Sequence, residues 1–209
     1  MSSTRRVNEL TAIRQLKSAL SGPPKSALAQ SNARLWNWFW QEAPIIRWGE
    51  TKSPLGPLFV ALSQHGLCAV DFGRSESDFI ARLDPRARLV RDAPALAQVT
   101  SQLKEYFAGD RVNFDLPIDL SALTPFQKHV LETARRIAPG QVWSYLRVAR
   151  EMGRPKSSRP VGQALAHNPV PIVIPCHRVI AADGSLGGYS GGAGLSAKRW
   201  LLRLEGASV

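Results

Sequence analysis

The sequence of 209 residues is poor in cysteine, histidine and long apolar runs. Its two cysteines, Cys68 and Cys176, are too few for a disulfide framework, so we expect reduced thiols. Its four histidines are scattered without metal-ligand spacing, so we predict no metal site, and nothing implies a cofactor. No run of about 18 apolar residues could cross a membrane. Residues 1–20 lack the apolar stretch of a secretory signal, so we expect a cytoplasmic or nucleoid-associated protein, or a nuclear one in a eukaryote.

Acidic residues are also scarce. The chain has 16 Asp and Glu against 27 Lys and Arg, which gives a net charge of +11 at pH 7. The excess is uneven: residues 120–209 hold twelve basic and four acidic residues, whereas residues 48–119 hold eight and ten. A basic block of this kind predicts an anionic partner, most often nucleic acid. With 44% apolar residues the chain has enough for a packed core, which excludes wholesale disorder.

The charge pattern and the local signals divide the chain into three parts. We expect a basic and partly flexible N-terminal extension over 1–45, an α/β domain over 46–119 and an anion-binding domain over 120–209. In the second part, two apolar runs around a short glycine-containing loop predict a β-hairpin of Leu58–Ser63 and Leu67–Phe72. Apolar residues at helical spacing predict a helix over 95–108 that ends at Gly109. The aromatic segment 35–40 is expected to cover the core of this domain.

The third part carries clear helix start and stop signals. Thr124, Pro125 and Gln127 predict an N-terminal capping box, and Ser144 predicts the cap of a second, shorter helix. A tight glycine-containing turn and a third helix over 160–167 follow, which makes a candidate helix-turn-helix. Helical hairpins also occur in proteins that bind no DNA, so the neighbouring positive charges favour the DNA-binding interpretation. These residues are Arg147, Arg150, Arg154, Lys156 and Arg159.

Cys176 and His177 follow the β-branched run Pro171–Ile174 and precede a glycine-rich loop. A thiolate is a strong nucleophile, and a neighbouring base or positive charge lowers the pKa of a thiol. A Cys-His pair alone also fits a buried, unreactive thiol beside a surface histidine. Cys68, which lies in an apolar run, is expected to be a buried, unreactive core cysteine. The two residues by themselves leave both interpretations open for Cys176.

The longer string over 168–180, Asn-Pro-Val-Pro-Ile-Val-Ile-Pro-Cys-His-Arg-Val-Ile, narrows the choice. It closely resembles the active-site segment of the O6-alkylguanine-DNA alkyltransferases, also called methylated-DNA–protein-cysteine methyltransferases. The match covers 122–206 and extends more weakly over 48–121. In the family's order it includes Phe126-Gln127, Pro139-Gly140, Ser144-Tyr145, Arg159, Val161-Gly162, Gly188-Tyr189-Ser190-Gly191-Gly192, Lys198, Leu201-Leu202 and Glu205-Gly206.

The resemblance implies an α+β fold and a DNA repair activity. The N-terminal α/β domain would be ribonuclease-H-like and would contain a small antiparallel sheet. The C-terminal domain would be mostly helical and would contain a winged helix-turn-helix-like motif. The protein would bind double-stranded DNA through the minor groove as a monomer and flip out O6-alkylguanine, chiefly O6-methylguanine, with O4-methylthymine left open. It would then transfer the alkyl group irreversibly to Cys176, once per molecule and without a cofactor.

The resemblance also assigns catalytic roles residue by residue. Cys176, His177, a water and Glu205 would form a relay similar in logic to a catalytic triad. Asn168 would tie the recognition helix to the active-site turn by hydrogen bonds. Tyr189 would donate a hydrogen bond toward N3 of the departing base and so stabilise its developing charge.

Further residues would bind the substrate. Tyr145 would crowd the phosphate of the target nucleotide, and Arg159 would fill the place of the flipped base. Gly162 would allow close approach of the DNA backbone. The backbone N–H of Ser190 would lie near O6, and the carbonyls of Cys176 and Val179 would accept from the exocyclic amine. Lys198 would lie near the same wall of the pocket.

One position departs from the family pattern and bears on the arginine. Because proline disfavours the α conformation of the preceding residue, Pro160 predicts that Arg159 is the cap of the third helix and lies just outside it. Three other functions compete with alkyl transfer: a non-catalytic protein that binds alkyl lesions, a plain helix-turn-helix DNA-binding protein, and a cysteine hydrolase. The lesion-binding type lacks the acceptor cysteine, which is present here as Cys176.

Overall fold

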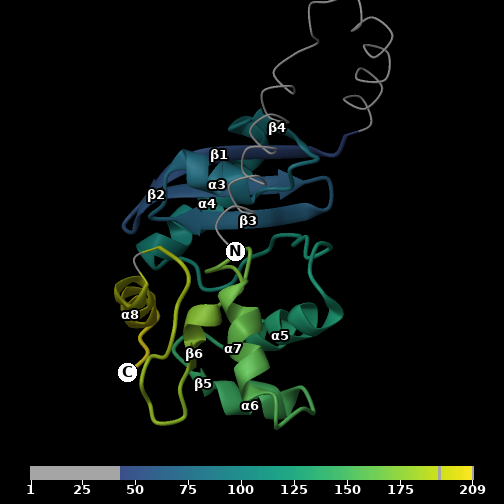
Figure 1. Cartoon of the computed structure of the whole chain (residues 1–209). Coiled ribbons are helices and arrows are strands. Elements are labelled where there is room, and N and C mark those ends of the chain that lie inside the picture. The colour runs from purple at the N-terminus through teal and green to yellow at the C-terminus, as the bar shows by residue number, and fades with distance from the viewer. Residues whose placement is uncertain (1–42, 193, 209) are drawn as a thin grey trace, which may run out of the picture. The chain divides into compact units, whose positions relative to one another are not determined.

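A four-stranded mixed sheet begins the described chain (Figure 1). The computed structural model describes residues 43–192 and 194–208, so the aromatic segment 35–40 and nearly all of the expected extension lie outside the described residues. The strands are β1 (Ile45–Ser53), β2 (Gly56–Ser63), β3 (Gly66–Phe72) and β4 (Arg88–Arg91), in the spatial order β3-β2-β1-β4. The predicted hairpin is confirmed as β2 and β3. β1 to β3 pair antiparallel as expected, and the sheet becomes mixed because β4 pairs parallel to β1.

Helices pack against both faces of the sheet. Successive strand residues point to opposite faces of the sheet. Leu58 and Val60 therefore share one face and lie in one core cluster with Leu96 and Val99. Leu96 comes just before α4 (Ala97–Ala108), and Val99 lies in its first turn. The alternate residue Phe59 packs on the other face against Phe79 of α3 (Glu76–Arg82), with ring centroids 5.3 Å apart. The predicted helix that ends at Gly109 is confirmed, with Gly109 in the left-handed conformation at its C-cap.

The C-terminal part is mostly helical, and its local signals are confirmed. It consists of α5 (Pro125–Arg135), α6 (Tyr145–Glu151), α7 (Ser158–Ala166), α8 (Leu195–Leu204) and the short parallel strands β5 (Trp143–Ser144) and β6 (Val179–Ile180). Thr124 and Gln127 form both hydrogen bonds of the capping box. The Ser144 side chain accepts from the backbone N–H of Arg147 and caps α6. None of the described helices is long and apolar enough to cross a membrane.

The expected placement of Arg159 outside the third helix is wrong. α7 begins at Ser158, so Arg159 and Pro160 both lie in its first turn. The backbone N–H of Val161 donates to the carbonyl of Ser157 and closes that turn. The first N–H groups of a helix have no acceptor within it, so a proline at the third position loses no hydrogen bond. The local preference of the residue before proline is therefore overridden.

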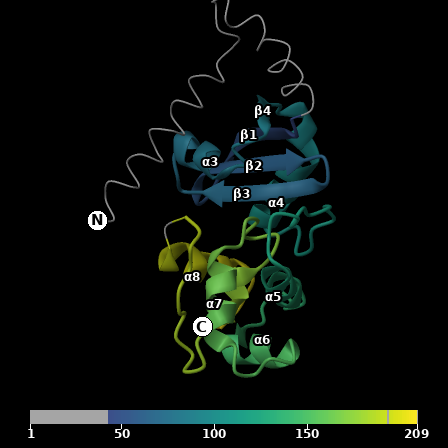
Figure 2. The ribbon, with the colours of Figure 1, turned by 45° about the vertical axis from the view of Figure 1, so that its right-hand side comes forward.

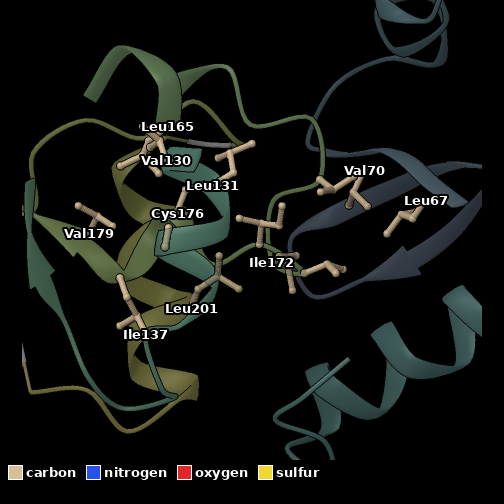
Figure 3. Packing of buried hydrophobic residues seen from close by; sticks show 14 of the residues in the cluster. Leu67, Val70, Val130, Leu131, Ile137, Leu165, Ile172, Cys176, Val179 and Leu201 are labelled. Atoms are coloured by element: carbon tan, nitrogen blue, oxygen red, sulfur yellow. The ribbon is translucent and has the colours of Figure 1, made fainter. Parts of the chain in front are cut away.

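Strand β3 is the part of the sheet that meets the helical part, as Figures 1 and 2 both show. The backbone N–H of Val70 donates to the carbonyl of Pro169, with an N···O distance of 2.8 Å. Buried residues of β3 and of the helical part belong to one hydrophobic cluster, and Figure 3 shows Ile172 between Val70 and the side chains around Cys176. The segment that carries the cysteine thus packs on the sheet.

Candidate active site

Cys176 begins a short 3-10 turn, η2 (Cys176–Arg178), and is 6% exposed. Asn168, just after α7, holds the backbone that leads to it. The Asn168 amide donates to the carbonyl of Ile174 (2.8 Å) and to Cys176 Sγ (3.2 Å). Its Oδ1 accepts from the backbone N–H of Val170 (3.1 Å). Asn168 therefore ties the end of α7 to the cysteine, as the resemblance implied.

The same turn contains a strained residue. Ile172 has a φ of 76°, and no other non-glycine residue of the described chain has a positive φ. This conformation is costly for a β-branched side chain and persists only where the surroundings enforce it. Here Ile172 is 1% exposed, and the Ile174 N–H closes the turn onto the carbonyl of Val170. Packing and hydrogen bonds together fix the direction in which Cys176 leaves the turn.

A buried carboxylate gathers the groups behind the cysteine. Glu205, at the end of α8, has a side chain that is 3% exposed. Its Oε1 lies 2.9 Å from His177 Nε2, 2.8 Å from Arg178 Nη2 and 2.7 Å from the Tyr106 hydroxyl. Its Oε2 accepts from Arg178 Nε at 2.8 Å. The histidine and the carboxylate are in direct contact, so the expected relay through a water between His177 and Glu205 is wrong.

The electrostatics of this cluster set the protonation of His177. Burial alone would raise the pKa of Glu205, but hydrogen bonds from His177 and Arg178 outweigh it and lower that pKa to about 2. Burial lowers the pKa of His177, so the imidazole is neutral at neutral pH. An ionised carboxylate only accepts hydrogen bonds, so Nε2 carries the imidazole proton. Nδ1 then keeps a free lone pair, and it has no hydrogen-bond partner among the described residues.

The Cys176 thiol is protonated at rest. Burial raises its pKa, which the hydrogen bond from Asn168 and the charge of Lys198 oppose but do not cancel. The nucleophile is the thiolate, so the proton must leave as the sulfur reacts. The neutral His177, with a free Nδ1 and an anionic Glu205 behind it, is the adjacent group that can take it.

A cavity of about 190 Å³ opens beside the thiol. Its walls bring together five of the expected site residues: Tyr145, Gly162, Cys176, Tyr189 and Ser190. Leu165, Ala166 and Gly188 complete the lining. Burial raises the pKa of Tyr189, so its hydroxyl stays protonated, and it has no hydrogen-bond partner in the described part of the chain. The cavity therefore has a thiol and apolar surface in its walls, with a buried, unpaired phenol hydroxyl on one of the lining residues.

The sheet supports the loop that carries Tyr189. The ring of Phe72, at the end of β3, lies 6.4 Å from the Tyr189 ring, centroid to centroid. Gly192 has a φ of 50°, and a Cβ there would lie 2.4 Å from the Phe72 ring. A side chain at Gly192 would push the loop off the strand, so this glycine is required by packing.

Lys198 lies behind the cavity wall. It is fully buried on α8, and its Nζ donates to the carbonyls of Val179 (2.5 Å), Leu186 (2.5 Å) and Gly188 (3.3 Å). Burial lowers the pKa of Lys198 to about 8. These contacts hold the loop, and neither Lys198 nor Val179 lines the cavity. Arg159 is exposed on α7 and also lies outside the cavity.

Sequence reasoning did not assign Tyr106 or give Arg178 a role in the carboxylate cluster. Tyr106 is 2% exposed and lies three residues after the buried Leu103 on α4. Its place on the apolar stripe was readable from the helical spacing, and a buried phenol normally has a hydrogen-bond partner. The partner itself was not readable, because Glu205 lies 99 residues away in the sequence.

A second, larger cavity of about 510 Å³ carries none of the expected site residues. It includes Cys68, whose pKa is raised to about 11, mainly by burial. The described residues contain no group of three His, Cys, Asp or Glu side chains that could hold a metal ion.

Comparison with known protein families matches most of the chain. Residues 46–120 match the ribonuclease-like domain of 6-O-methylguanine DNA methyltransferase, and residues 125–207 match its DNA binding domain. A methylated-DNA–protein-cysteine methyltransferase of Shigella flexneri is 40% identical over 159 residues, 74% of this chain and 92% of that protein. One of Methanosarcina acetivorans is 36% identical over 156 residues, 75% of this chain and 96% of that protein.

Solved structures show the same fold. The crystal structure of Mycobacterium tuberculosis OGT in complex with DNA has a TM-score of 0.67 and 37% identity, and the match covers 77% of this chain and 92% of that one. The O6-methylguanine-DNA methyltransferase of Pyrococcus kodakaraensis has a TM-score of 0.55 at 23% identity and is similar in fold, with 78% of this chain covered. The expected α+β architecture is confirmed.

Proposed function

Because the chain belongs to the methylated-DNA–protein-cysteine methyltransferases, DNA repair proteins that transfer an alkyl group to one of their own cysteines, we propose that Cys176 is the acceptor. One observation carries the proposal: the Cys176 thiol opens into a cavity lined by two tyrosines and lies next to a buried His177–Glu205 pair. A hydrolase would share the Cys-His pair, but nothing in its chemistry requires the basic α6–α7 hairpin. The family assignment therefore explains both features.

The thiol cannot reach a paired base. Cys176 is 6% exposed and lies in a cavity, whereas O6 of a stacked guanine lies inside the duplex, so the nucleotide must leave the stack. We propose that α7 binds in the minor groove, that Arg159 takes the place of the flipped base and that Tyr145 turns the phosphate. Arg159 is exposed in the first turn of α7, and Tyr145 and Gly162 line the cavity next to that helix. One chain contains every one of these groups, which supports the proposal that the protein acts as a monomer.

The transfer itself exchanges one bond for another. Sγ of Cys176 attacks the alkyl carbon, the bond from that carbon to O6 breaks, and its electron pair stays on the guanine. The thiol proton passes to Nδ1 of His177, through a bridging water, while Glu205 stabilises the imidazolium. Tyr189 donates to N3 of the base and stabilises the charge that develops there. The product is a thioether, which the protein has no group to cleave, so each molecule reacts once.

Three groups support the base rather than react with it. The backbone N–H of Ser190 lies at the cavity wall, where it can donate toward O6. The carbonyl of Cys176 can accept from the exocyclic amine, whereas the Val179 carbonyl lies outside the cavity lining and would reach the amine only if the wall shifts, with a second lone pair beside its bond from Lys198. Lys198 acts through the loop that it holds. Whether the protein also repairs other alkylated bases, such as O4-methylthymine, depends on how they fit the walls of the same cavity.

We also propose the division of the chain into 1–45, 46–119 and 120–209, which the matched ranges 46–120 and 125–207 support. A thiol that must stay reduced fits the cytoplasm or the nucleoid, where DNA is the substrate. The basic residues of 120–209 supply phosphate contacts that do not depend on sequence.

The activity is tested by intact mass measurement. After incubation with an oligonucleotide duplex that contains O6-methylguanine, we expect the protein to gain one methyl group on Cys176 and to saturate at one per molecule. A protein that only binds lesions or DNA would gain no mass, and a hydrolase would consume more than one equivalent without keeping an adduct. Either result would contradict the proposal.

Arg159→Ala tests the role of the arginine in base flipping. We expect transfer from duplex O6-methylguanine to slow about tenfold or more, while transfer from a free O6-alkylguanine base stays unchanged, because a free base needs no flipping. Lys156→Ala is the matched control: it removes one exposed positive charge beside the same helix. It should weaken duplex binding and its salt dependence without the large rate loss. If Arg159→Ala slowed transfer from the duplex and from the free base equally, the role of Arg159 in base flipping would be ruled out.

A further inference from the structure

The hydroxyl of Tyr106 connects the N-terminal domain to the active site. Tyr106 lies on α4, is 2% exposed, and its hydroxyl donates to Glu205 Oε1 at 2.7 Å. Its ring packs against Phe107 and Phe114, with centroids 5.5 Å away in each case, so the phenol is held in place. Burial and the neighbouring Glu205 charge raise the pKa of Tyr106 far above its usual value. The phenol is therefore a permanent donor to the carboxylate.

Glu205 Oε1 is the oxygen that also contacts His177 Nε2. It accepts three hydrogen bonds, from Tyr106, His177 and Arg178, whereas Oε2 accepts one, from Arg178. A carboxylate with this many donors has one orientation, and the donors share its negative charge. Tyr106 is the member of this set that does not come from the C-terminal part.

We propose that Tyr106 is a positioning residue for alkyl transfer, which holds Glu205 Oε1 against His177 Nε2 and limits the negative charge that this oxygen presents to the imidazole. The inference rests on the proposed function, because it concerns the same proton transfer. Tyr106 does not line the cavity, and its hydroxyl reaches the activating groups through its hydrogen bond to Glu205. The N-terminal domain thus supplies a part of the activating network.

Loss of the hydroxyl has a directional consequence. With one donor fewer, Oε1 presents more negative charge to His177 and stabilises the imidazolium. The pKa of His177 then rises, so the imidazole becomes protonated at a higher pH than in the wild type. The carboxylate also loses one of its fixed contacts and aligns the imidazole less well. The poorer alignment slows transfer at every pH, whereas the rise in the pKa of His177 moves the acidic limb of the pH dependence.

The test is Tyr106→Phe, which removes the hydroxyl and keeps the ring. We expect the single-turnover rate constant on an O6-methylguanine duplex to fall about fivefold to tenfold at neutral pH. The acidic limb of the pH–rate profile should also move to higher pH than in the wild type. Duplex affinity should stay as in the wild type, because Tyr106 is buried away from the exposed residues of α7.

Phe107→Leu is the matched control, because it disturbs the ring packing of Tyr106 and leaves the hydroxyl in place. We expect this variant to lose some thermal stability while its pH–rate profile stays unchanged. An unmoved profile for Tyr106→Phe, with or without a slower rate, would overturn the inference and reduce Tyr106 to a packing residue. If the wild type itself gains no methyl group, the proposed function fails, and that outcome is distinct because it appears without any substitution.

Discussion

Cys176→Ala is expected to abolish alkyl transfer completely, with no mass gained by the protein even at long incubation with an O6-methylguanine duplex. The sulfur is the atom that forms the new bond, and no neighbouring group can replace it. The chain has one other thiol, Cys68, which lies outside the 190 Å³ cavity and whose pKa is raised to about 11. Cys68 is therefore neither placed nor ionised for the reaction.

The loss in Cys176→Ala should come from chemistry and not from unfolding. Cys176 packs as a small apolar side chain in the core cluster, and its sulfur accepts one hydrogen bond, from Asn168. Alanine leaves a small void and a weak bond unmade, which costs about 1 kcal/mol. We expect circular dichroism, thermal unfolding and duplex binding to stay close to those of the wild type.

Cys68→Ser is the control for this experiment, and it should transfer the alkyl group at the wild-type rate. A methyl adduct on Cys176→Ala, located by peptide mass mapping on any residue, would disprove the assignment of the acceptor. A loss of transfer in Cys68→Ser with an intact fold would point to a role for that thiol.

Local features of the fold were predictable from the sequence because they depend on neighbours in the chain. Thr124 and Gln127 form a capping box over three residues, and Ser144 caps α6 in the same way. The signal is chemical and needs no tertiary context. The hairpin β2–β3 was equally readable, because its loop is short and its strands are apolar.

Features that depend on distant segments were not predictable. β4 is four residues long, and its pairing with β1 requires a crossover that no local pattern encodes. Arg159 was expected at a cap because the rule for residues before proline is local, whereas the backbone of α7 begins at Ser158. The contact from Tyr106 to Glu205 joins residues 99 positions apart, so only the folded chain reveals it.

The cysteine motif shows the difference most clearly. The order of Asn168, Cys176 and His177 in the sequence identified the family, but it did not give the conformation of the turn between them. That turn requires a positive φ at Ile172, which a sequence rule would exclude for a β-branched residue. The structure shows how it is enforced: Asn168 satisfies one backbone donor and one backbone acceptor inside the turn, and Ile172 is buried against the sheet.

Asn168→Ala should therefore impair both stability and transfer. It leaves the carbonyl of Ile174 and the N–H of Val170 without their side-chain partner, and both lie in a buried segment. The Ile174 carbonyl keeps its bond from the Cys176 N–H, so the Val170 N–H is the group left unsatisfied. One such group costs about 1–3 kcal/mol, so we expect a Tm lower by about 2–12 °C. The turn at Ile172 then loses its restraint, and the single-turnover rate should fall about a hundredfold.

Asn168→Asp separates positioning from the electrostatic part, because it keeps the shape and the oxygen that accepts from Val170. It removes the donor to Cys176 Sγ and to the Ile174 carbonyl, which keeps its bond from the Cys176 N–H, and it places a negative charge beside the thiol, so the thiol pKa rises further. Transfer should then be slow at neutral pH and recover as the pH is raised, whereas Asn168→Ala should be slow at every pH. Thermal unfolding and pH–rate profiles of the two variants measure this. Wild-type rates in Asn168→Ala would show that the turn holds Cys176 without the amide, and the strain at Ile172 would then be carried by packing against the sheet alone.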